Sequence, residues 1–210
     1  MRVRSANFVT SCADPKAADS YSPHIAVAGR SNCGKSSLLN MLMGARLCKT
    51  SQTPGRTRLI NVFRVNADAP FYFIDLPGYG FNAAQRATSD ELNARTDAYF
   101  RGNDNIAQVL CLMDVRRDPS DLDKVLINYL RDLCLPFTVV ITKADKLSKA
   151  QLGNAKLRIA AALGLARDDL IVTSSSKNIG RDALLDRLQN VLEVFGSDAE
   201  NGDAPNDDEQ

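Results

Sequence analysis

The sequence predicts an α/β protein with a mostly parallel, six-stranded sheet. Short apolar runs rich in β-branched residues alternate with segments of helical period, which is the pattern of parallel strands joined by crossover helices. The composition, 44% hydrophobic and 24% charged over 210 residues, is typical of one compact domain. No run of about 18 apolar residues occurs, so we expect no transmembrane helix. The predicted strands are residues 25–28, 59–65, 71–74, 109–113, 137–141 and 170–173.

Loop length and apolar spacing refine this arrangement. Only residues 66–70 separate the second and third predicted strands, so these two should form an antiparallel hairpin within the sheet. Two helical segments carry apolar stripes that we expect to face the core. The stripes consist of Leu122, Val125, Leu126, Tyr129, Leu130 and Leu133, and of Leu184, Leu185, Leu188, Val191, Leu192 and Phe195.

The two ends of the chain differ from its central part. Residues 1–21 are expected to be an N-terminal extension ahead of a folded domain at residues 22–195. Residues 196–210 hold six of the 25 acidic residues and no Lys or Arg, which predicts a disordered tail. The 26 basic side chains therefore leave residues 1–195 with a net charge of +7. His24, the only histidine, is expected at the surface or at the start of a strand.

The cysteines indicate the compartment. The chain has five, an odd number, and no C-x-x-C pair, which argues against a disulfide framework and against a zinc site. Residues 1–10 lack the apolar core and the cleavage site of a secretory signal. We therefore expect free thiols and a cytoplasmic protein.

A phosphate-binding loop (P-loop) follows the first predicted strand. The residues from Gly29 to Ser36 match G-x-x-x-x-G-K-[ST] between a strand and a helix, as this motif requires. Its two glycines let backbone amides face a phosphate, and the helix N-terminus adds partial positive charge. Lys35 can neutralise β- and γ-phosphate oxygens, while the Ser36 hydroxyl is a suitable ligand for Mg²⁺.

Two later motifs indicate which nucleotide binds. Asp75 and Gly78 form a D-x-x-G suited to Mg²⁺ and to the γ-phosphate, although alone it is also an ordinary turn. The residues Thr142 to Asp145 read T-K-A-D at the end of the fifth predicted strand. By itself this segment could cap a helix, but an Asp there can accept two hydrogen bonds from guanine, and adenine offers neither. In this order the motifs predict a guanine-nucleotide site, with the stem of Lys143 along the base.

The segment after the sixth predicted strand supports a guanine-nucleotide site, to which one other class of nucleotide enzyme is an alternative. Small side chains from Thr173 to Ser176 follow that strand and would let backbone amides approach the guanine oxygen. A small-molecule kinase built on the same loop would need an acceptor site and an arginine-bearing lid. The T-K-A-D segment argues against it.

Together these motifs resemble the translation-factor-like (TrmE-Era-EngA-YihA-septin) P-loop GTPases. They are most similar to the EngB (YihA/YsxC) family of ribosome-biogenesis GTPases, which is linked to cell division and septation. The resemblance covers residues 22–195 and implies a Ras-like fold, with helices on both faces of the sheet and the nucleotide at the carboxyl ends of the strands. It is carried by G-R-S-N-x-G-K-S-S from Gly29, T-P-G-R-T from Thr53, D-L-P-G-Y-G from Asp75, T-K-A-D from Thr142, and the pair Ser174 and Ser175.

The resemblance also implies roles for single residues. Thr57 would be the switch I threonine, which joins Mg²⁺ through its hydroxyl and senses the γ-phosphate through its amide, and Thr53 is the weaker candidate for this role. Tyr79 stands where Ras has a water-orienting glutamine, so intrinsic hydrolysis should be slow. Asn32 matches the asparagine with which related GTPases bind K⁺, although it could equally stabilise the loop through its own hydrogen bonds. Two positions depart from the family: Arg58, where Gln is usual, and Cys33, where Val or Ala is more common.

The implied site residues fall into three groups. The catalytic residues are Lys35, Thr57 and Gly78, and the Mg²⁺ ligands are Ser36, Thr57 and Asp75. The expected nucleotide contacts are Gly29, Arg30, Ser31, Asn32, Cys33, Gly34, Lys35, Ser36, Ser37, Gly55, Arg56, Thr57, Arg58, Leu59, Asp75, Leu76, Pro77, Gly78, Thr142, Lys143, Ala144, Asp145, Thr173, Ser174 and Ser175.

The function implied is that of a GTPase switch. GTP and Mg²⁺ would order residues 46–57 and 77–89, and hydrolysis to GDP would release both. The ordered surface would bind an immature large ribosomal subunit, towards whose rRNA the positive body of the chain is attracted. An alternative is a nucleotide-dependent interaction protein that acts directly on the division machinery and depends little on hydrolysis. In either case we expect a monomer without a membrane partner.

Overall fold

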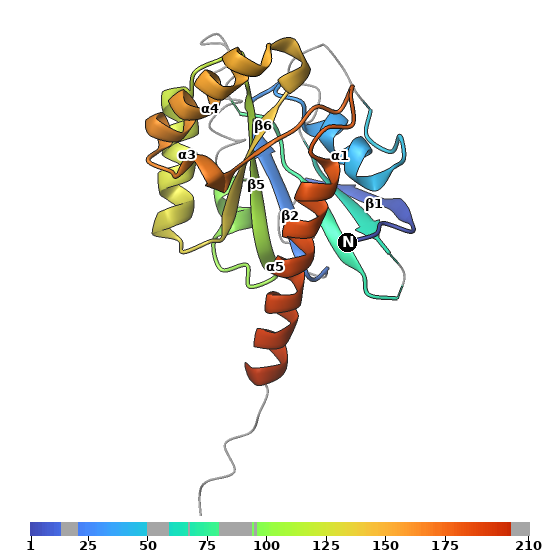
Figure 1. Ribbon diagram of the computed structural model, residues 1–210. Helices are drawn as coiled ribbons and strands as arrows, with labels where there is room; N and C mark the ends of the chain where they lie inside the picture. The colour runs from blue at the N-terminus through green and yellow to red at the C-terminus, as the bar shows by residue number, and fades with distance from the viewer. Residues whose placement is uncertain (14–20, 50–58, 67, 80–93, 95, 203–210) are drawn as a thin grey trace, which may run out of the picture.

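The structure of the chain is a computed structural model. It describes residues 1–13, 21–49, 59–66, 68–79, 94 and 96–202. Within these ranges the chain forms one sheet with helices packed on both of its faces (Figure 1). The predicted α/β class is therefore confirmed.

The sheet has seven strands in the order β1-β3-β4-β2-β5-β6-β7. The pairs β2–β4, β2–β5, β5–β6 and β6–β7 are parallel, whereas β1–β3 and β3–β4 are antiparallel. The hairpin predicted around residues 66–70 is the β3–β4 pair and is thus confirmed. The strand bounds are β1 Ala6–Cys12, β2 His24–Gly29, β3 Ile60–Val65, β4 Phe71–Asp75, β5 Ile106–Asp114, β6 Phe137–Thr142 and β7 Leu170–Val172.

Each face of the sheet has its own helices and its own buried cluster. One cluster joins the sheet to α1, Lys35–Met43, and α5, Arg181–Gly202. The other joins it to α3, Asp121–Asp132, and α4, Lys149–Leu163. Two 3₁₀ turns, Ala144–Lys146 and Arg167–Asp169, lie next to α4 in the chain. Because both faces are covered, β2 and β5 are buried along their whole length, as expected for parallel strands.

Local side-chain contacts define the helix ends. Ser120 and Ser148 form capping boxes that satisfy the first amides of α3 and α4. At the other end of α1, the Arg181 guanidinium donates hydrogen bonds to the carbonyls of Met41 and Leu42, at 2.8 and 3.0 Å. This contact satisfies carbonyls that a helix leaves unpaired and ties α1 to the start of α5.

The strand β1 was not predicted, and the expected count of six strands is wrong by one. Among the described strands it lies at the edge of the sheet and pairs with β3 alone. Most of its side chains are at least partly exposed, so it has no apolar alternation to reveal it. Backbone pairing with β3 therefore places part of the predicted N-terminal extension in the sheet.

The apolar stripe predicted for α3 is partly wrong. Leu126 and Leu130 are buried as expected, but Leu122 and Val125 have exposed fractions of 46% and 62%. The buried face instead includes Ile127. Helical geometry places Leu126, Ile127 and Leu130 on one face, whereas Leu122 lies at its margin and Val125 on the opposite side of the helix.

The C-terminal segment also differs from the prediction. The helix α5 continues to Gly202, so residues 196–202 are helical, and Figure 1 shows this end projecting beyond the sheet. Composition alone favoured disorder because it ignores the continuation of an existing helix. Residues 203–210 lie outside the described part of the chain.

The structure shows where the histidine and most of the cysteines lie. His24 is the first residue of β2 and is fully buried, so the strand-start alternative holds and the surface alternative does not. Cys33, Cys48 and Cys111 are buried thiols, and Cys134 is an exposed one.

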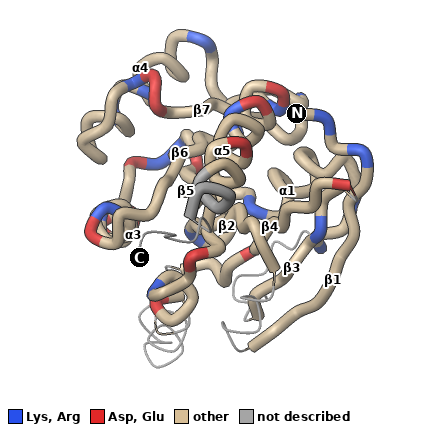
Figure 2. Tube along the Cα trace, turned by 90° about the horizontal axis from the view of Figure 1, so that it is seen from below, with Lys and Arg blue, Asp and Glu red and all other residues tan. Residues whose placement is uncertain are grey.

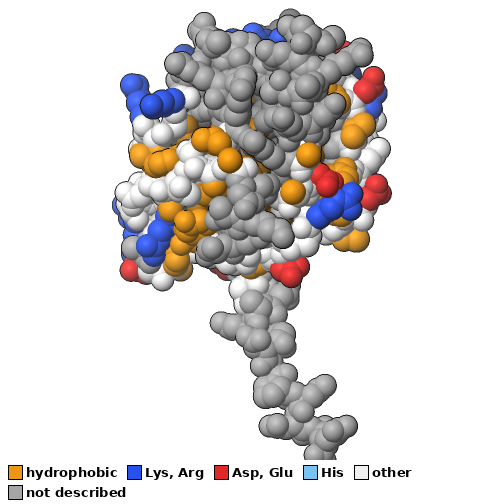
Figure 3. All heavy atoms as spheres, turned by 180° about the vertical axis from the view of Figure 1, so that it is seen from behind, with side chains coloured by type: hydrophobic (Ala, Val, Ile, Leu, Met, Phe, Trp, Pro, Cys, Tyr) orange, Lys and Arg blue, Asp and Glu red, His pale blue; other side chains and the backbone are white. Residues whose placement is uncertain are grey.

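The surface carries scattered hydrophobic side chains. On the face opposite to that of Figure 1, Figure 3 shows them in several separate groups between polar side chains. Isolated exposed apolar groups of this kind are normal for a globular protein. Among the described helices, none combines the length and apolar character needed to cross a membrane.

Two glycines provide a matched test of this backbone. Gly180 has a φ of +75°, and an added Cβ would lie 2.0 Å from the Val172 carbonyl oxygen. Around Gly153, inside α4, no atom of the described residues other than the backbone of its own helix lies within 4 Å of such a Cβ. We expect Gly180→Ala to lower the free energy of unfolding by at least about 2 kcal/mol, and Gly153→Ala to raise it by up to about 1 kcal/mol.

The measurement is chemical denaturation followed by circular dichroism. A Gly180→Ala variant as stable as the parent protein would contradict the tight approach between Gly180 and β7. The Gly153→Ala variant controls for the general effect of adding a methyl group.

Candidate functional site

The predicted motifs meet at one edge of the sheet. The P-loop follows β2, D-x-x-G follows β4, T-K-A-D begins at the end of β6, and the serine-rich segment follows β7. These strands are parallel neighbours, apart from β5 between β2 and β6. Because parallel strands end at the same edge, four segments far apart in the sequence form one site.

The glycines of the P-loop are required by close packing and by backbone conformation. A Cβ on Gly29 would lie 2.7 Å from the Cys33 sulfur and 3.0 Å from the Leu112 carbonyl oxygen. Gly34 has a φ of +112°, which side chains rarely allow. The loop therefore keeps a tight shape that a larger residue at either position would disturb.

The N-terminus of α1 is prepared for an anion. Its N-cap is Gly34, which has no side chain that could accept hydrogen bonds from the amides of the first turn. That turn also holds no acidic residue. Ser36 and Ser37 lie in this turn, with Ser37 exposed. Helix amides without a side-chain acceptor bind phosphate through hydrogen bonds and the helix dipole.

Lys35 and Gly78 lie next to one another beside the P-loop. The Lys35 Nζ donates a hydrogen bond of 3.1 Å to the Gly29 carbonyl. A Cβ on Gly78 would lie 2.9 Å from that Nζ and 2.9 Å from the Ser31 hydroxyl. The structure thus brings together the lysine and the D-x-x-G glycine that were both predicted to serve the γ-phosphate.

Asp75 is a buried carboxylate with an unused acceptor. It ends β4 and is 3% exposed, and its Oδ1 has no hydrogen-bond partner among the described residues. Burial raises the pKa of Asp75 to about 6, although the nearby Lys35 ammonium and a hydrogen bond from Asn61 act in the opposite direction. An unpaired buried carboxylate oxygen beside Lys35 is a suitable site for a hard cation.

Asp145 is oriented by the segment that follows β7. The Ser174 hydroxyl donates a hydrogen bond of 2.6 Å to the Asp145 Oδ1, and Lys146 pairs with its Oδ2 at 3.0 Å. These two contacts lower the pKa of Asp145 to about 2, so the side chain is a carboxylate at neutral pH. The Ala144 amide also bonds to the Thr173 carbonyl, which fixes T-K-A-D against the serine-rich segment.

T-K-A-D is bonded equally closely to the P-loop. The Thr142 hydroxyl contacts the Cys33 carbonyl at 2.5 Å, and the Lys143 Nζ contacts the Asn32 carbonyl at 2.6 Å. Lys143 also pairs with Asp114 at 2.9 Å, at the end of β5. The phosphate-binding and base-reading segments are therefore held as one unit.

The Tyr79 side chain is directed towards α3. Its hydroxyl donates a hydrogen bond of 2.9 Å to Asp123, while its carbonyl accepts one of 3.1 Å from the Ser31 amide. Burial and the neighbouring Asp123 raise the pKa of Tyr79 well above its usual range. The phenol is thus a neutral donor engaged with α3.

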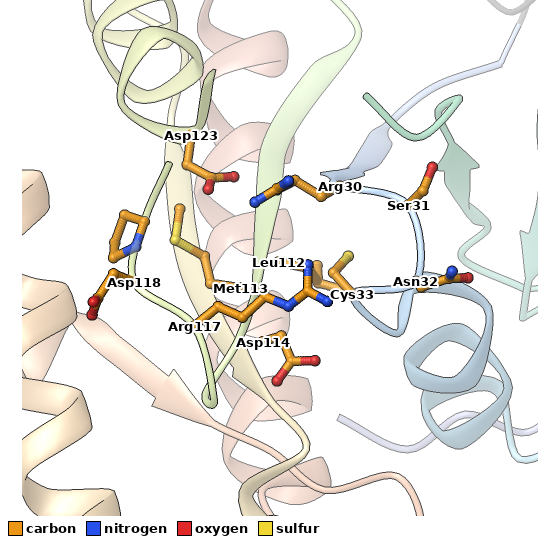
Figure 4. A pocket seen from close by; sticks show the side chains of 11 residues that line it. Arg30, Ser31, Asn32, Cys33, Leu112, Met113, Asp114, Arg117, Asp118 and Asp123 are labelled. Atoms are coloured by element: carbon orange, nitrogen blue, oxygen red, sulfur yellow. The ribbon is translucent and has the colours of Figure 1, made fainter. Parts of the chain in front are cut away.

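A pocket lies between the P-loop and the loop that follows β5 (Figure 4). Residues 30–33 line one side, and residues 112–114 and 117–119 line the other. In Figure 4 the Arg30 side chain extends from the P-loop towards Asp123. Neither Asp75 nor Asp145 lines this pocket, so it lies beside the predicted cation and base sites.

Several predicted residues are not part of this geometry. Thr53, Gly55, Arg56, Thr57 and Arg58 lie outside the described residues. Leu59 directly precedes β3 and is 40% exposed.

The sequence reasoning also missed two buried acids, Asp114 and Asp123, that contact site residues. In the sequence, Asp114 is recognisable as an acidic residue at the end of an apolar strand, and Asp123 as an acidic residue in the first turn of the next helix. Either acid could be an ordinary helix-capping residue, so only its contacts in the structure show that it belongs to the site.

Comparison with known proteins agrees with this arrangement. Residues 24–143 match the family model described as "50S ribosome-binding GTPase". A "Probable GTP-binding protein EngB" from Geobacter metallireducens is 40% identical, over 95% of this chain and 98% of the relative. The protein of that name from Desulfosudis oleivorans is 37% identical, over 92% of this chain and 100% of the relative.

Solved structures share the fold. A crystal structure of a probable GTP-binding protein EngB matches with a TM-score of 0.66 and 22% identity, over 81% of this chain and 98% of the other. Aquifex aeolicus Era bound to GDP·AlF4⁻ matches with a TM-score of 0.65 and 23% identity, over 82% of this chain and 56% of the other. At these identities the structures support the fold alone.

The ordered motifs and the curated relatives lead to the same assignment. The matched family region includes the P-loop, the D-x-x-G and the first two residues of T-K-A-D, Thr142 and Lys143. The matched relatives cover nearly the whole chain. The chain belongs to the EngB family of P-loop GTPases.

Proposed function

We propose that this GTPase is a molecular switch in the assembly of the large ribosomal subunit, needed for normal cell division and septation, and that it acts in the cytoplasm as a monomer. Residues 22–195 would form its GTPase domain. The observation that carries guanine recognition is Asp145, an ionised carboxylate fixed by Ser174 and joined through T-K-A-D to the P-loop. A base reader and a phosphate cradle in one rigid unit are what GTP binding requires.

The phosphates would bind at the P-loop. Backbone amides of residues 30–36 and the N-terminus of α1 would contact their oxygens, and Lys35 would exchange the Gly29 carbonyl for the β- and γ-phosphates. Gly78 lies against Lys35, so its amide is close to the expected γ-phosphate position. Positive charge fixed there would stabilise the charge that develops on the transferred phosphoryl group.

The acidic and hydroxyl residues of the site fit Mg²⁺. Asp75 with its unpartnered Oδ1, and Ser36 in the first turn of α1, would hold the ion together with Thr57. All three offer hard oxygen ligands, which Mg²⁺ prefers. When bound, Mg²⁺ would neutralise charge on the β- and γ-phosphate oxygens.

Slow intrinsic hydrolysis is supported by the position of Tyr79. In Ras-like sites the residue after D-x-x-G orients the attacking water through an amide side chain. Here that residue is a neutral phenol whose hydroxyl donates a hydrogen bond to Asp123 on α3. Some other group must therefore supply catalytic charge or orient the water.

Asn32 is a candidate for that role through K⁺. It lies exposed in the P-loop with a φ of 63°, a conformation that Asn tolerates better than most residues. Its carboxamide oxygen is an acceptable K⁺ ligand. When bound, K⁺ would supply positive charge near the phosphates, as an arginine finger does in other GTPases.

The net charge and the family membership support a ribosomal partner. Residues 1–195 carry a net charge of +7, which attracts a polyphosphate such as rRNA. Figure 2 shows that Lys and Arg are interspersed with Asp and Glu over the described part of the chain, so this attraction is diffuse. Binding of a large-subunit precursor would then depend on the surface that GTP orders.

The first prediction concerns the base reader. In Asp145→Asn the amide can no longer accept both guanine donors, so GTP and GDP affinity should fall by at least about 100-fold while xanthosine diphosphate affinity rises. Fluorescent-nucleotide titration measures both. Asp168→Asn, whose side chain is 90% exposed, is the matched control. Unchanged GDP affinity in Asp145→Asn would refute the role of Asp145.

The second prediction concerns K⁺. We expect GTP hydrolysis to be several-fold faster in KCl than in NaCl, because Asn32 would hold the larger cation near the phosphates. Asn32→Gly keeps the left-handed backbone but should reduce this ratio to about one. Asn66→Gly, at a residue with a φ of 58° in the β3–β4 hairpin, is the control. Equal rates in the two salts, with and without ribosomal particles, would remove the K⁺ assignment.

The third prediction concerns the partner. Loaded with a non-hydrolysable GTP analogue, the protein should co-sediment with large-subunit particles, and loading with GDP should release it. Co-sedimentation that ignores the nucleotide would contradict the switch. Enrichment with septal complexes at unchanged ribosome profiles would support direct action on the division machinery instead.

A further inference from the structure

The strand β5 ends in a charged residue whose burial needs an explanation. All nine residues of this strand are buried, and the last of them, Asp114, is 8% exposed. A carboxylate removed from water in this way is costly unless other groups pair with it. Its partners therefore indicate what it does.

Asp114 is held from one side by Arg116. The Arg116 guanidinium donates two hydrogen bonds to the two carboxylate oxygens, at 2.9 and 2.6 Å, and its backbone amide adds one of 3.1 Å. A two-point contact of this kind fixes the plane of the carboxylate as well as its position. Burial acts to raise the pKa of Asp114, but Arg116 and Lys143 outweigh it and hold the pKa well below its usual range.

From the other side Asp114 contacts Lys143. The distance from its Oδ2 to the Lys143 Nζ is 2.9 Å, and the same Nζ lies 2.6 Å from the Asn32 carbonyl oxygen. One ammonium group therefore joins the end of β5 to the P-loop. Its side chain is only 28% exposed, which leaves it few alternative partners.

The backbone of Lys143 also indicates a constrained position. Its φ of 60° is left-handed, a conformation that costs free energy in any residue except glycine. Such conformations persist where surrounding contacts fix them, and they concentrate at functional sites. Lys143 stands two residues before Asp145, so its conformation and that of the base reader are linked.

We propose that Asp114, oriented by Arg116, is a positioning residue for guanine-nucleotide binding: its carboxylate holds the Lys143 ammonium on the Asn32 carbonyl and so keeps the Lys143 stem along the base that Asp145 reads. This inference rests on the proposed binding of guanine nucleotides. It adds a third strand end, that of β5, to the strand ends that carry the P-loop and T-K-A-D.

The neighbouring acids do not share this role. Asp118 and Asp123 line the same pocket as Asp114 (Figure 4). Asp118 pairs with Arg158 on α4 and is 70% exposed, whereas Asp123 accepts the Tyr79 hydroxyl. Of these three acids, Asp114 alone contacts T-K-A-D.

The test begins with Asp114→Asn in the full chain. The amide has nearly the shape of the carboxylate but lacks its charge, so Lys143 loses its ion pair. We expect fluorescent GDP to bind about tenfold more weakly, mainly through faster dissociation. Asp118→Asn, four residues along the same loop, should bind GDP as the parent protein does. Parent-like GDP affinity in Asp114→Asn would overturn the proposal.

A double-mutant cycle separates positioning from a general structural effect. In a Lys143→Met background, which keeps an apolar stem but no ammonium, Asp114→Asn should change GDP affinity by less than about twofold. If the two effects instead multiply, Asp114 does not act through Lys143 and the proposal fails. Should Asp114→Asn fail to fold, Arg116→Gln takes its place in the cycle, with an expected loss of about threefold that also vanishes in Lys143→Met.

The affinities of the parent protein for ATP and GDP distinguish a failure of this inference from a failure of the proposed function on which it rests. If it binds ATP as tightly as GDP, the proposed guanine site fails, and the inference fails with it. If it prefers GDP and the Asp114 variants bind normally, only the positioning role is lost.

Discussion

The parallel register of the central strands is the constraint on which the site depends. Pairing of β2 with β4 and β5, and of β6 with β5 and β7, brings the carboxyl ends of five strands to one edge. The Thr142 hydroxyl and the Cys33 carbonyl are 109 residues apart in sequence yet 2.5 Å apart in space. Contacts this short require fixed register, since a slip of one residue would turn each side chain to the opposite face. The burial of β2 and β5 on both faces fixes this register.

The buried and partly buried carboxylates divide into those the protein satisfies and one it does not. The Asp114 carboxylate is paired with Arg116 and Lys143. The Asp123 carboxylate accepts hydrogen bonds from Tyr79 and Ser120. Asp145 is oriented by Ser174, and part of its surface is accessible. Within the described part of the chain, Asp75 alone among these four keeps a buried oxygen without a hydrogen-bond partner. Paired carboxylates organise the loops around them, whereas an unpaired one retains capacity for a ligand. This difference explains why Asp75 fits a metal ligand and Asp114 fits a positioning residue.

The same contacts couple the ends of the nucleotide site. Lys143 bonds to the P-loop, Ala144 to the segment after β7, and Tyr79 to both the P-loop and α3. A ligand that moves any one of these loops therefore acts on contacts made by the others. Such linkage suits a switch, in which differential contacts with two ligand states change a surface elsewhere.

The amino-acid sequence by itself determined the α/β class, the β3–β4 hairpin and the order of the four motifs, because these depend on local periodicity and on short, specific spacings. It did not reveal β1, whose exposed edge position leaves no apolar alternation, nor the helical continuation of α5 past residue 195. It also could not identify Asp114 and Asp123, since an acid after a strand or in a first helical turn has several ordinary meanings. Only tertiary structure decided their partners, because long-range pairing places Asp114 against Lys143, and Asp123 against Tyr79, across 29 and 44 residues of chain.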